Sequence, residues 1–231
     1  MPKHIGIVAV TAEGAALCYQ TICAEGPAVL GPDRHPEVTL HAFSLNDYLP
    51  LAKAGDWERM GSLLLASAAK LGKAGADFLI CPANTAHLAI DLIRDHSPLP
   101  WLHIAEEVAS DAERRGLKRL LLLGTRALME GPVYPPYLSR RGIAHEIPGS
   151  SDLARMNDII FDELIFARFT GESRAYSQRL IREFGERGGD GVILGCTELP
   201  LLLPDAESPL PVLDSTRVLA RAAIREAAKE S

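Results

Sequence analysis

This chain of 231 residues has few cysteines, no excess of basic charge and no long hydrophobic run. Its four cysteines are too few and too scattered for a disulfide framework, and no Cys or His spacing is typical of a metal site. The formal net charge of −6 argues against nucleic-acid binding, which usually needs a basic surface. No apolar run approaches the roughly 20 residues of a membrane span, and the N-terminus lacks the pattern of a signal peptide. We therefore expect a cytoplasmic protein that holds no metal and binds neither nucleic acid nor membrane.

What the sequence does contain is an alternation of strand-length apolar runs and helix-length amphipathic stretches. This alternation predicts an α/β fold with parallel sheets joined by right-handed crossovers. Two segments, residues 26–36 with their prolines and glycines and the polar residues 46–56, are expected to be loops. Strands are expected at residues 4–10, 38–43, 78–81, 101–104, 119–123, 143–147, 192–194 and 212–213.

Two stretches of the chain have similar sequences, and we call them the first and second echo. Residues 77–87 read DFLICPANTAH and residues 190–200 read DGVILGCTELP, at an offset of 113 positions (190 minus 77). Thr125 answers Thr11 at nearly the same offset. The repeat predicts two pseudo-symmetric parallel-sheet α/β domains with an active-site cleft between them. The first would contain residues 1–106 and 214–231, and the second residues 107–213.

The cysteine in the second echo is the strongest functional signal. Cys196 follows an apolar strand and a glycine, so we expect it at the carboxyl end of that strand, where open α/β sheets bind ligands. A helix beginning at this cysteine would favour its thiolate form. The equivalent position in the first echo, residue 83, is alanine.

Equivalent residues of two facing halves can approach one carbon from opposite sides, which suits moving a proton between its two faces. A thiol can take part in such a transfer if its pKa approaches the working pH. The carbanion would need hydrogen-bond donors for the substrate carboxylate. Strand-end side chains could supply them, or could serve only as helix caps or turn residues: Asn84, Thr85, Thr125 and Thr197.

Six motifs together resemble the cofactor-independent aspartate/glutamate racemases, within the aspartate/glutamate/hydantoin racemase superfamily. They are NTAH at 84–87, LHIA at 102–105, LGTR at 123–126, NDIIFDE at 157–163, FTGESRA at 169–175 and GCTE at 195–198. The resemblance implies an interdomain active site, a small amino-acid or carboxylic-acid substrate, no cofactor and a homodimer. It also implies that Cys196 is catalytic and that the first catalytic cysteine is missing, because Ala83 stands in its place.

The missing cysteine leaves three alternatives open. The first is a racemase or epimerase whose second proton carrier is Thr85, a water or a displaced Cys81. The second is a one-cysteine decarboxylase or a non-racemising isomerase, since one proton donor suffices after CO2 leaves. The third is a binding protein without turnover.

The remaining candidates have structural readings beside the functional ones. Thr11 lies at the end of the first strand but could simply cap the next helix. Glu198 could bind substrate, or could be a carboxylate favoured by a helix dipole. His87 and Cys81 are more often core residues than reactive groups at such positions.

Overall fold

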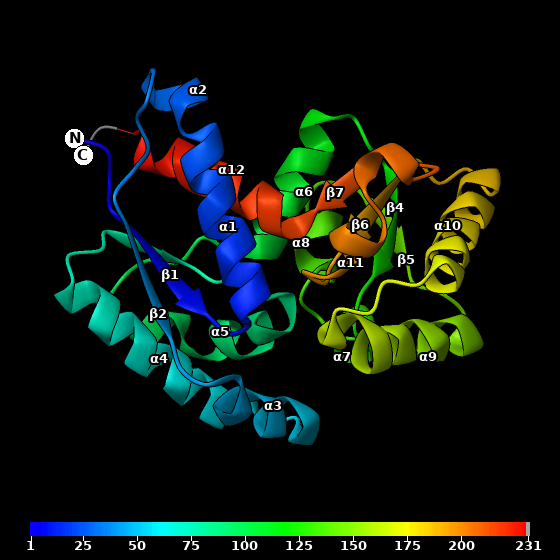
Figure 1. The fold of residues 1–231 in the computed structure, drawn as a ribbon, viewed down its shortest axis with the longest axis horizontal. Coiled ribbons are helices and arrows are strands. Elements are labelled where there is room, and N and C mark those ends of the chain that lie inside the picture. The colour runs from blue at the N-terminus through cyan, green and yellow to red at the C-terminus, as the bar shows by residue number, and fades with distance from the viewer. Residues whose placement is uncertain (230–231) are drawn as a thin grey trace. The chain divides into compact units, whose positions relative to one another are not determined.

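The computed structural model describes residues 1–229, which divide into two compact units (Figure 1). One unit contains Met1–Glu107 and the chain from Thr216 onward, and the other contains Val108–Ser215. The predicted boundaries lie within two residues of these. Residues 230 and 231, which the prediction assigned to the first half, lie outside the described residues.

The first unit is built on a parallel sheet with the strand order β2-β1-β3. Its strands are β1 (Ile5–Ala9), β2 (Val38–Ala42) and β3 (Phe78–Ile80). The predicted fourth strand at 101–104 is reduced to one bridge, between Trp101 and Leu79. The helices around it are α1 (Ala12–Glu25), α2 (Pro27–Leu30), α3 (Leu45–Ala54), α4 (Trp57–Lys73), η1 (Asn84–Ala86), α5 (His87–Ile93), η2 (Arg94–His96) and the start of α6 (Ile104–Arg114).

The second unit repeats this plan with the parallel strand order β5-β4-β6-β7. Its strands are β4 (Arg119–Leu123), β5 (Ala144–Glu146), β6 (Gly191–Leu194) and β7 (Val212–Asp214). Its other elements are α7 (Arg126–Met129), α8 (Pro135–Ser139), α9 (Ser150–Asp158), the π-helical turn η3 (Ile159–Glu163), η4 (Leu164–Phe166), α10 (Gly171–Glu186), α11 (Leu199–Leu202) and η5 (Asp205–Glu207). The last helix, α12 (Ser215–Ala227), belongs to the first unit from Thr216 onward. The predicted α/β class with parallel sheets is confirmed.

The aspartate that opens each echo has the same structural role in both units. Asp77 Oδ2 accepts a hydrogen bond from the His4 backbone N–H at 2.6 Å. Asp190 accepts from the backbone N–H groups of Lys118 at 2.7 Å and Arg119 at 2.9 Å. In each case the carboxylate before one strand holds the beginning of the neighbouring central strand.

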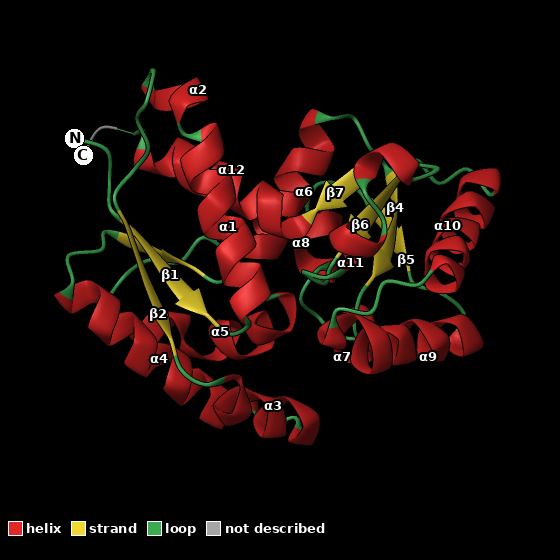
Figure 2. Cartoon of the chain, in the orientation of Figure 1, coloured by secondary structure: helices red, strands yellow, loops and turns green. Residues whose placement is uncertain are grey.

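Both predicted loops contain helices (Figure 2). Residues 26–36 include the short helix α2, which begins with Pro27, a residue suited to the first helical turn. Residues 46–56 are mostly helix α3, so the loop prediction there is wrong. Ser44 caps α3 by accepting from the Asn46 N–H, and Gly55 ends it in a left-handed conformation. Because the segment is mostly polar, these two helix-end residues were not recognised from the sequence.

Within the described residues, no helix combines the length and the apolar character needed to cross a lipid bilayer.

Candidate functional site

Two glycines shape the strand ends of the second unit. The Gly195 N–H donates to the Leu123 carbonyl at 2.7 Å and extends the pairing of β6 with β4 by one residue. A Cβ atom on Gly195 would lie 2.5 Å from Leu128 Cδ2, and one on Gly124 would lie 2.8 Å from the same atom. A side chain at either position would therefore require Leu128 to move. Because the two strands are neighbours and parallel, the residues that follow both glycines emerge at the same edge of the sheet.

Cys196 follows Gly195 and is hydrogen-bonded to a carboxylate. Its Sγ lies 2.9 Å from Glu198 Oε2, and Glu198 is only 6% exposed, while Cys196 itself is partly exposed. Burial raises the pKa of the Cys196 thiol well above its ordinary value, and the charge and hydrogen bond of Glu198 raise it further. The backbone N–H groups of Glu198 and Leu199 lower it, but by less.

The expectation that a helix N-terminus would favour the thiolate is therefore wrong. Cys196 lies before the first helical residue, Leu199, and α11 has only four residues. So short a helix has little dipole, and the two N–H groups near the sulfur do not outweigh burial beside a carboxylate. The resting form of Cys196 is the thiol.

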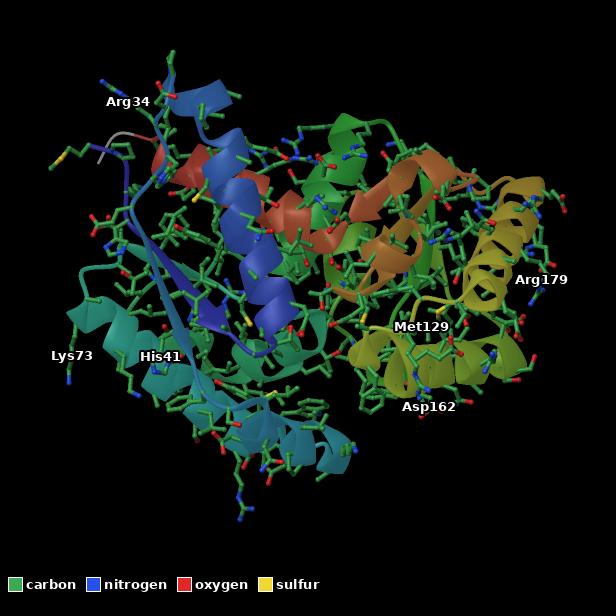
Figure 3. The ribbon with its side chains drawn as sticks, viewed as in Figure 1. Arg34, His41, Lys73, Met129, Asp162 and Arg179 are labelled. Atoms are coloured by element: carbon green, nitrogen blue, oxygen red, sulfur yellow. The ribbon has the colours of Figure 1, made fainter. Side chains whose placement is uncertain are left out.

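Thr125 lies after Gly124, at the same edge of the sheet. Its hydroxyl accepts from the Leu128 N–H at 3.4 Å, and its carbonyl accepts from the Met129 N–H at 2.9 Å (Met129 is labelled in Figure 3). Asn157 Oδ1 accepts from the Arg126 N–H at 2.9 Å and so holds the same turn. Asn157 begins the NDIIFDE motif, but this hydrogen bond could not be predicted from the motif. Thr125 thus caps α7.

The remaining polar candidates of the second unit differ in how exposed their side chains are. Thr197 is 7% exposed and lies between Cys196 and Glu198. Two arginines of this unit that could bind a substrate carboxylate are both exposed: Arg126 pairs with Glu130, and Arg168 donates to the carbonyl of Asp162. Neither is paired with a residue of the Cys196 turn.

In the first unit, Ala83 occupies the position equivalent to Cys196. It is partly exposed and has an extended backbone. Its carbonyl accepts from His87 Nδ1 at 3.1 Å, and His87 Nε2 accepts from the Ile104 N–H at 3.2 Å. His87 is fully buried, and burial lowers its pKa well below 6.5. His87 is therefore a neutral core residue that ties the turn after β3 to the start of α6.

Asn84 and Thr85 lie within η1 and not at the cap positions of η1 or α5. The residues at the cap positions of η1 and α5 are Ala83 and Ala86, and neither makes a side-chain cap hydrogen bond. Asn84 is 3% exposed and Thr85 is half-buried within η1. Thr11 does cap α1, because its hydroxyl accepts from the Gly14 N–H at 3.4 Å.

Cys81 is part of the hydrophobic core. It is fully buried and belongs to the same apolar cluster as Leu64, Leu79 and Ile90. Burial raises the pKa of its thiol to about 12. The prediction that Cys81 is buried is confirmed, but Cys81 lies one residue beyond the end of β3. Its thiol remains protonated near neutral pH.

In residues 1–229, no group of three or more His, Cys, Asp or Glu side chains is placed to hold a metal ion.

Two parallel α/β units, the second with glycine turns at its strand ends and a cysteine–carboxylate pair, define the class of this protein. The profile of the Asp/Glu/hydantoin racemase family matches residues 6–223, and the chain belongs to that family. The broad specificity amino-acid racemase RacX of Bacillus subtilis (strain 168) is 27% identical over 169 residues, which are 73% of each chain.

Two solved structures resemble the chain over almost its whole length. One is a protein from Yersinia pestis described as a candidate Asp/Glu racemase, with 31% identity, a TM-score of 0.89, and coverage of 98% of this chain and 100% of the other. The second is an aspartate racemase homologue from Pyrococcus horikoshii OT3, with 29% identity, a TM-score of 0.84, and coverage of 99% and 100%.

Proposed function

We propose that this protein transfers protons at the α-carbon of a small amino or carboxylic acid, as an amino-acid racemase or epimerase, with Cys196 as the acid/base group. The observation that carries the proposal is the hydrogen bond between the Cys196 thiol and Glu198, at the carboxyl end of β6. This strand edge is the usual ligand-binding edge of parallel sheets. Membership of the racemase family supports the same reaction type.

Cys196 and Glu198 form a pair that carries one proton. In the resting pair the proton is on sulfur and the charge is on the carboxylate, because the pKa of Cys196 is raised. Such a thiol is set to protonate a carbanion. To act as a base, the pair moves its proton from Cys196 to Glu198, and the N–H groups of Glu198 and Leu199 stabilise the thiolate that results.

The role proposed for Glu198 is thus different from direct substrate binding. Its carboxylate is engaged with Cys196, and a second negative charge on the substrate would be repelled by it. Substrate-binding roles are proposed for the other strand-end residues, whose hydroxyl, amide and backbone N–H groups can donate to a substrate carboxylate: Thr11, Asn84, Thr85, Thr125 and Thr197.

The alanine at position 83 supports a second candidate function. The methyl side chain of Ala83 has no acidic proton. The buried thiol of Cys81 is not suited to replace a base at that position. Nor is the neutral His87, because both of its ring nitrogens are already hydrogen-bonded. A one-cysteine decarboxylase or a non-racemising isomerase needs only the Cys196 side. Full inversion requires a further proton carrier, of which Thr85 or a water are the remaining choices.

The test is chiral chromatography of both enantiomers of aspartate, glutamate and a panel of neutral amino acids, with CO2 release from substituted malonates measured in parallel. We expect turnover by the wild type, loss of about 10²-fold or more in Cys196→Ala, and no change in Cys23→Ala, a control at another partly exposed cysteine. CO2 release without inversion would assign the second candidate. Equal turnover by Cys196→Ala would contradict the role of Cys196.

The complementary variant is Ala83→Cys. If the wild type inverts slowly or not at all, this substitution should raise the rate of inversion, because it supplies the missing thiol. If neither the wild type nor Ala83→Cys shows turnover, the result would indicate a binding protein without catalytic activity.

A further inference from the structure

A buried hydroxyl in the first unit has no hydrogen-bond partner within the described residues. Tyr48 lies in the first turn of α3 and is 1% exposed, and its Oη is among the buried polar atoms that no described donor or acceptor satisfies. Buried hydroxyl groups are nearly always hydrogen-bonded, so an unsatisfied one calls for a physical reason. A phenylalanine would fill almost the same space without the unsatisfied group.

The position of this hydroxyl is at the carboxyl edge of the sheet. α3 follows directly from β2, and Figure 1 shows it continuing from the end of that strand. Tyr48 belongs to the buried cluster that contains Cys81 and Ala86, and the partly buried Ala83 packs against that cluster. The ring of Tyr48 lies 6.5 Å from that of Phe43. The electrostatic effect of Cys81 on Tyr48 also places the two groups close together. Tyr48 therefore shares its apolar cluster with Cys81, which lies two residues before Ala83.

The hydroxyl is held in its neutral form. Burial raises the pKa of Tyr48 far above its ordinary value, and the charges that Cys81 and Asp47 can carry raise it further. A neutral phenol can donate one hydrogen bond. Carboxylate and carbonyl oxygens are suitable acceptors for it, and small amino and carboxylic acids carry them.

We propose that Tyr48 is a substrate-binding residue, and that its hydroxyl donates a hydrogen bond to a carboxylate or carbonyl oxygen of a small acid bound beside Ala83. Ala83 is one of the partly exposed residues packed against this cluster and occupies the position equivalent to Cys196, so we place the substrate oxygen on its side. The unsatisfied donor weakens the free protein and is satisfied when substrate binds. This inference rests on the proposed function and extends it to the first unit.

The test is Tyr48→Phe, measured for stability and for turnover. Removing an unsatisfied donor should raise Tm by about 1 to 3 °C, while loss of the hydrogen bond to substrate should lower kcat/KM by about 10- to 100-fold, mainly through KM. The matched control is Tyr176→Phe, whose hydroxyl donates to Asp152 Oδ1 at 2.6 Å; it should lower Tm and leave kcat/KM unchanged.

A Tyr48→Phe variant with unchanged kcat/KM, or with lower Tm, would overturn the inference. If the wild type turns nothing over, the proposed function fails separately, and Tyr48 is then judged by binding. L-Aspartate and malonate should raise the Tm of the wild type more than that of Tyr48→Phe. Equal shifts, or no shift in either protein, would overturn the inference.

Discussion

At the scale of single residues, the chemistry that we propose depends on Cys196 and Glu198. Cys196 is partly exposed and Glu198 is buried, and their side chains share one hydrogen bond of 2.9 Å. Because the charge of Glu198 raises the pKa of the thiol, the ionisation of Cys196 is coupled to Glu198. The reactivity of the cysteine should therefore depend directly on its neighbour.

Glu198→Gln should change two properties of Cys196 in opposite directions. Removing the negative charge lowers the pKa of the thiol, so alkylation of Cys196 by iodoacetamide at pH 8 should become several-fold faster, since the thiolate population changes tenfold for each unit of pKa. Turnover should fall by about 10²-fold, because the proton acceptor within the pair is lost. Peptide mass spectrometry separates adducts on Cys196 from those on Cys23. Slower alkylation, or unchanged turnover, would contradict the coupling.

His87 should make the protein less stable in acid. Its folded-state pKa is lowered, so below about pH 6.5 the unfolded chain binds a proton that the native protein does not. Stability should therefore fall with decreasing pH, with a contribution of up to about 1.4 kcal/mol per pH unit from this residue. Urea unfolding from pH 7 to pH 5 measures it. His87→Gln should be less stable at pH 7 but should show a shallower pH dependence; an equally steep dependence would exclude this role.

The sequence was informative about residue identity and less so about residue state. It singled out Cys196 and the alanine at its equivalent position, because both follow from the internal repeat. It assigned the wrong direction to the pKa of Cys196, since the contact with Glu198 depends on how a turn folds. The burial of the Tyr48 hydroxyl could not be predicted from the sequence, because it depends on packing against residues distant in the chain.

At the scale of elements, the repeated aspartates explain why the two units share one plan. Each accepts backbone hydrogen bonds at the start of the central strand of its sheet. Strands with long apolar runs, such as β4, were predictable from their composition. α3 was not, because its amphipathic character is weak and its limits depend on Ser44 and Gly55.

The two aspartates offer a matched pair of substitutions. Asp190→Ala should cost roughly 1 to 3 kcal/mol of stability, because two backbone N–H groups lose a charged acceptor. Asp77→Ala should cost less, since only the His4 N–H loses its partner. Denaturant unfolding of both variants measures the difference. A larger loss in Asp77→Ala would contradict the roles assigned to the two carboxylates.

At the scale of the whole molecule, the internal repeat, the two α/β units and the family membership agree. Two related units provide two equivalent strand-end positions, and only one of them carries a thiol. The chain therefore has the fold of the racemase family, and in our proposal it keeps one of two proton carriers. The central claim is that this remaining carrier, Cys196, exchanges a proton with the α-carbon of a small acid.

The most direct test is the uptake of solvent deuterium at the α-carbon, followed by proton NMR in D2O with both enantiomers of aspartate, glutamate and neutral amino acids. Deuterium uptake does not require inversion, so it detects a single proton carrier. We predict loss of the α-proton signal with the wild type and a rate at least about 10²-fold lower with Cys196→Ala. Exchange at the same rate in Cys196→Ala would contradict the account.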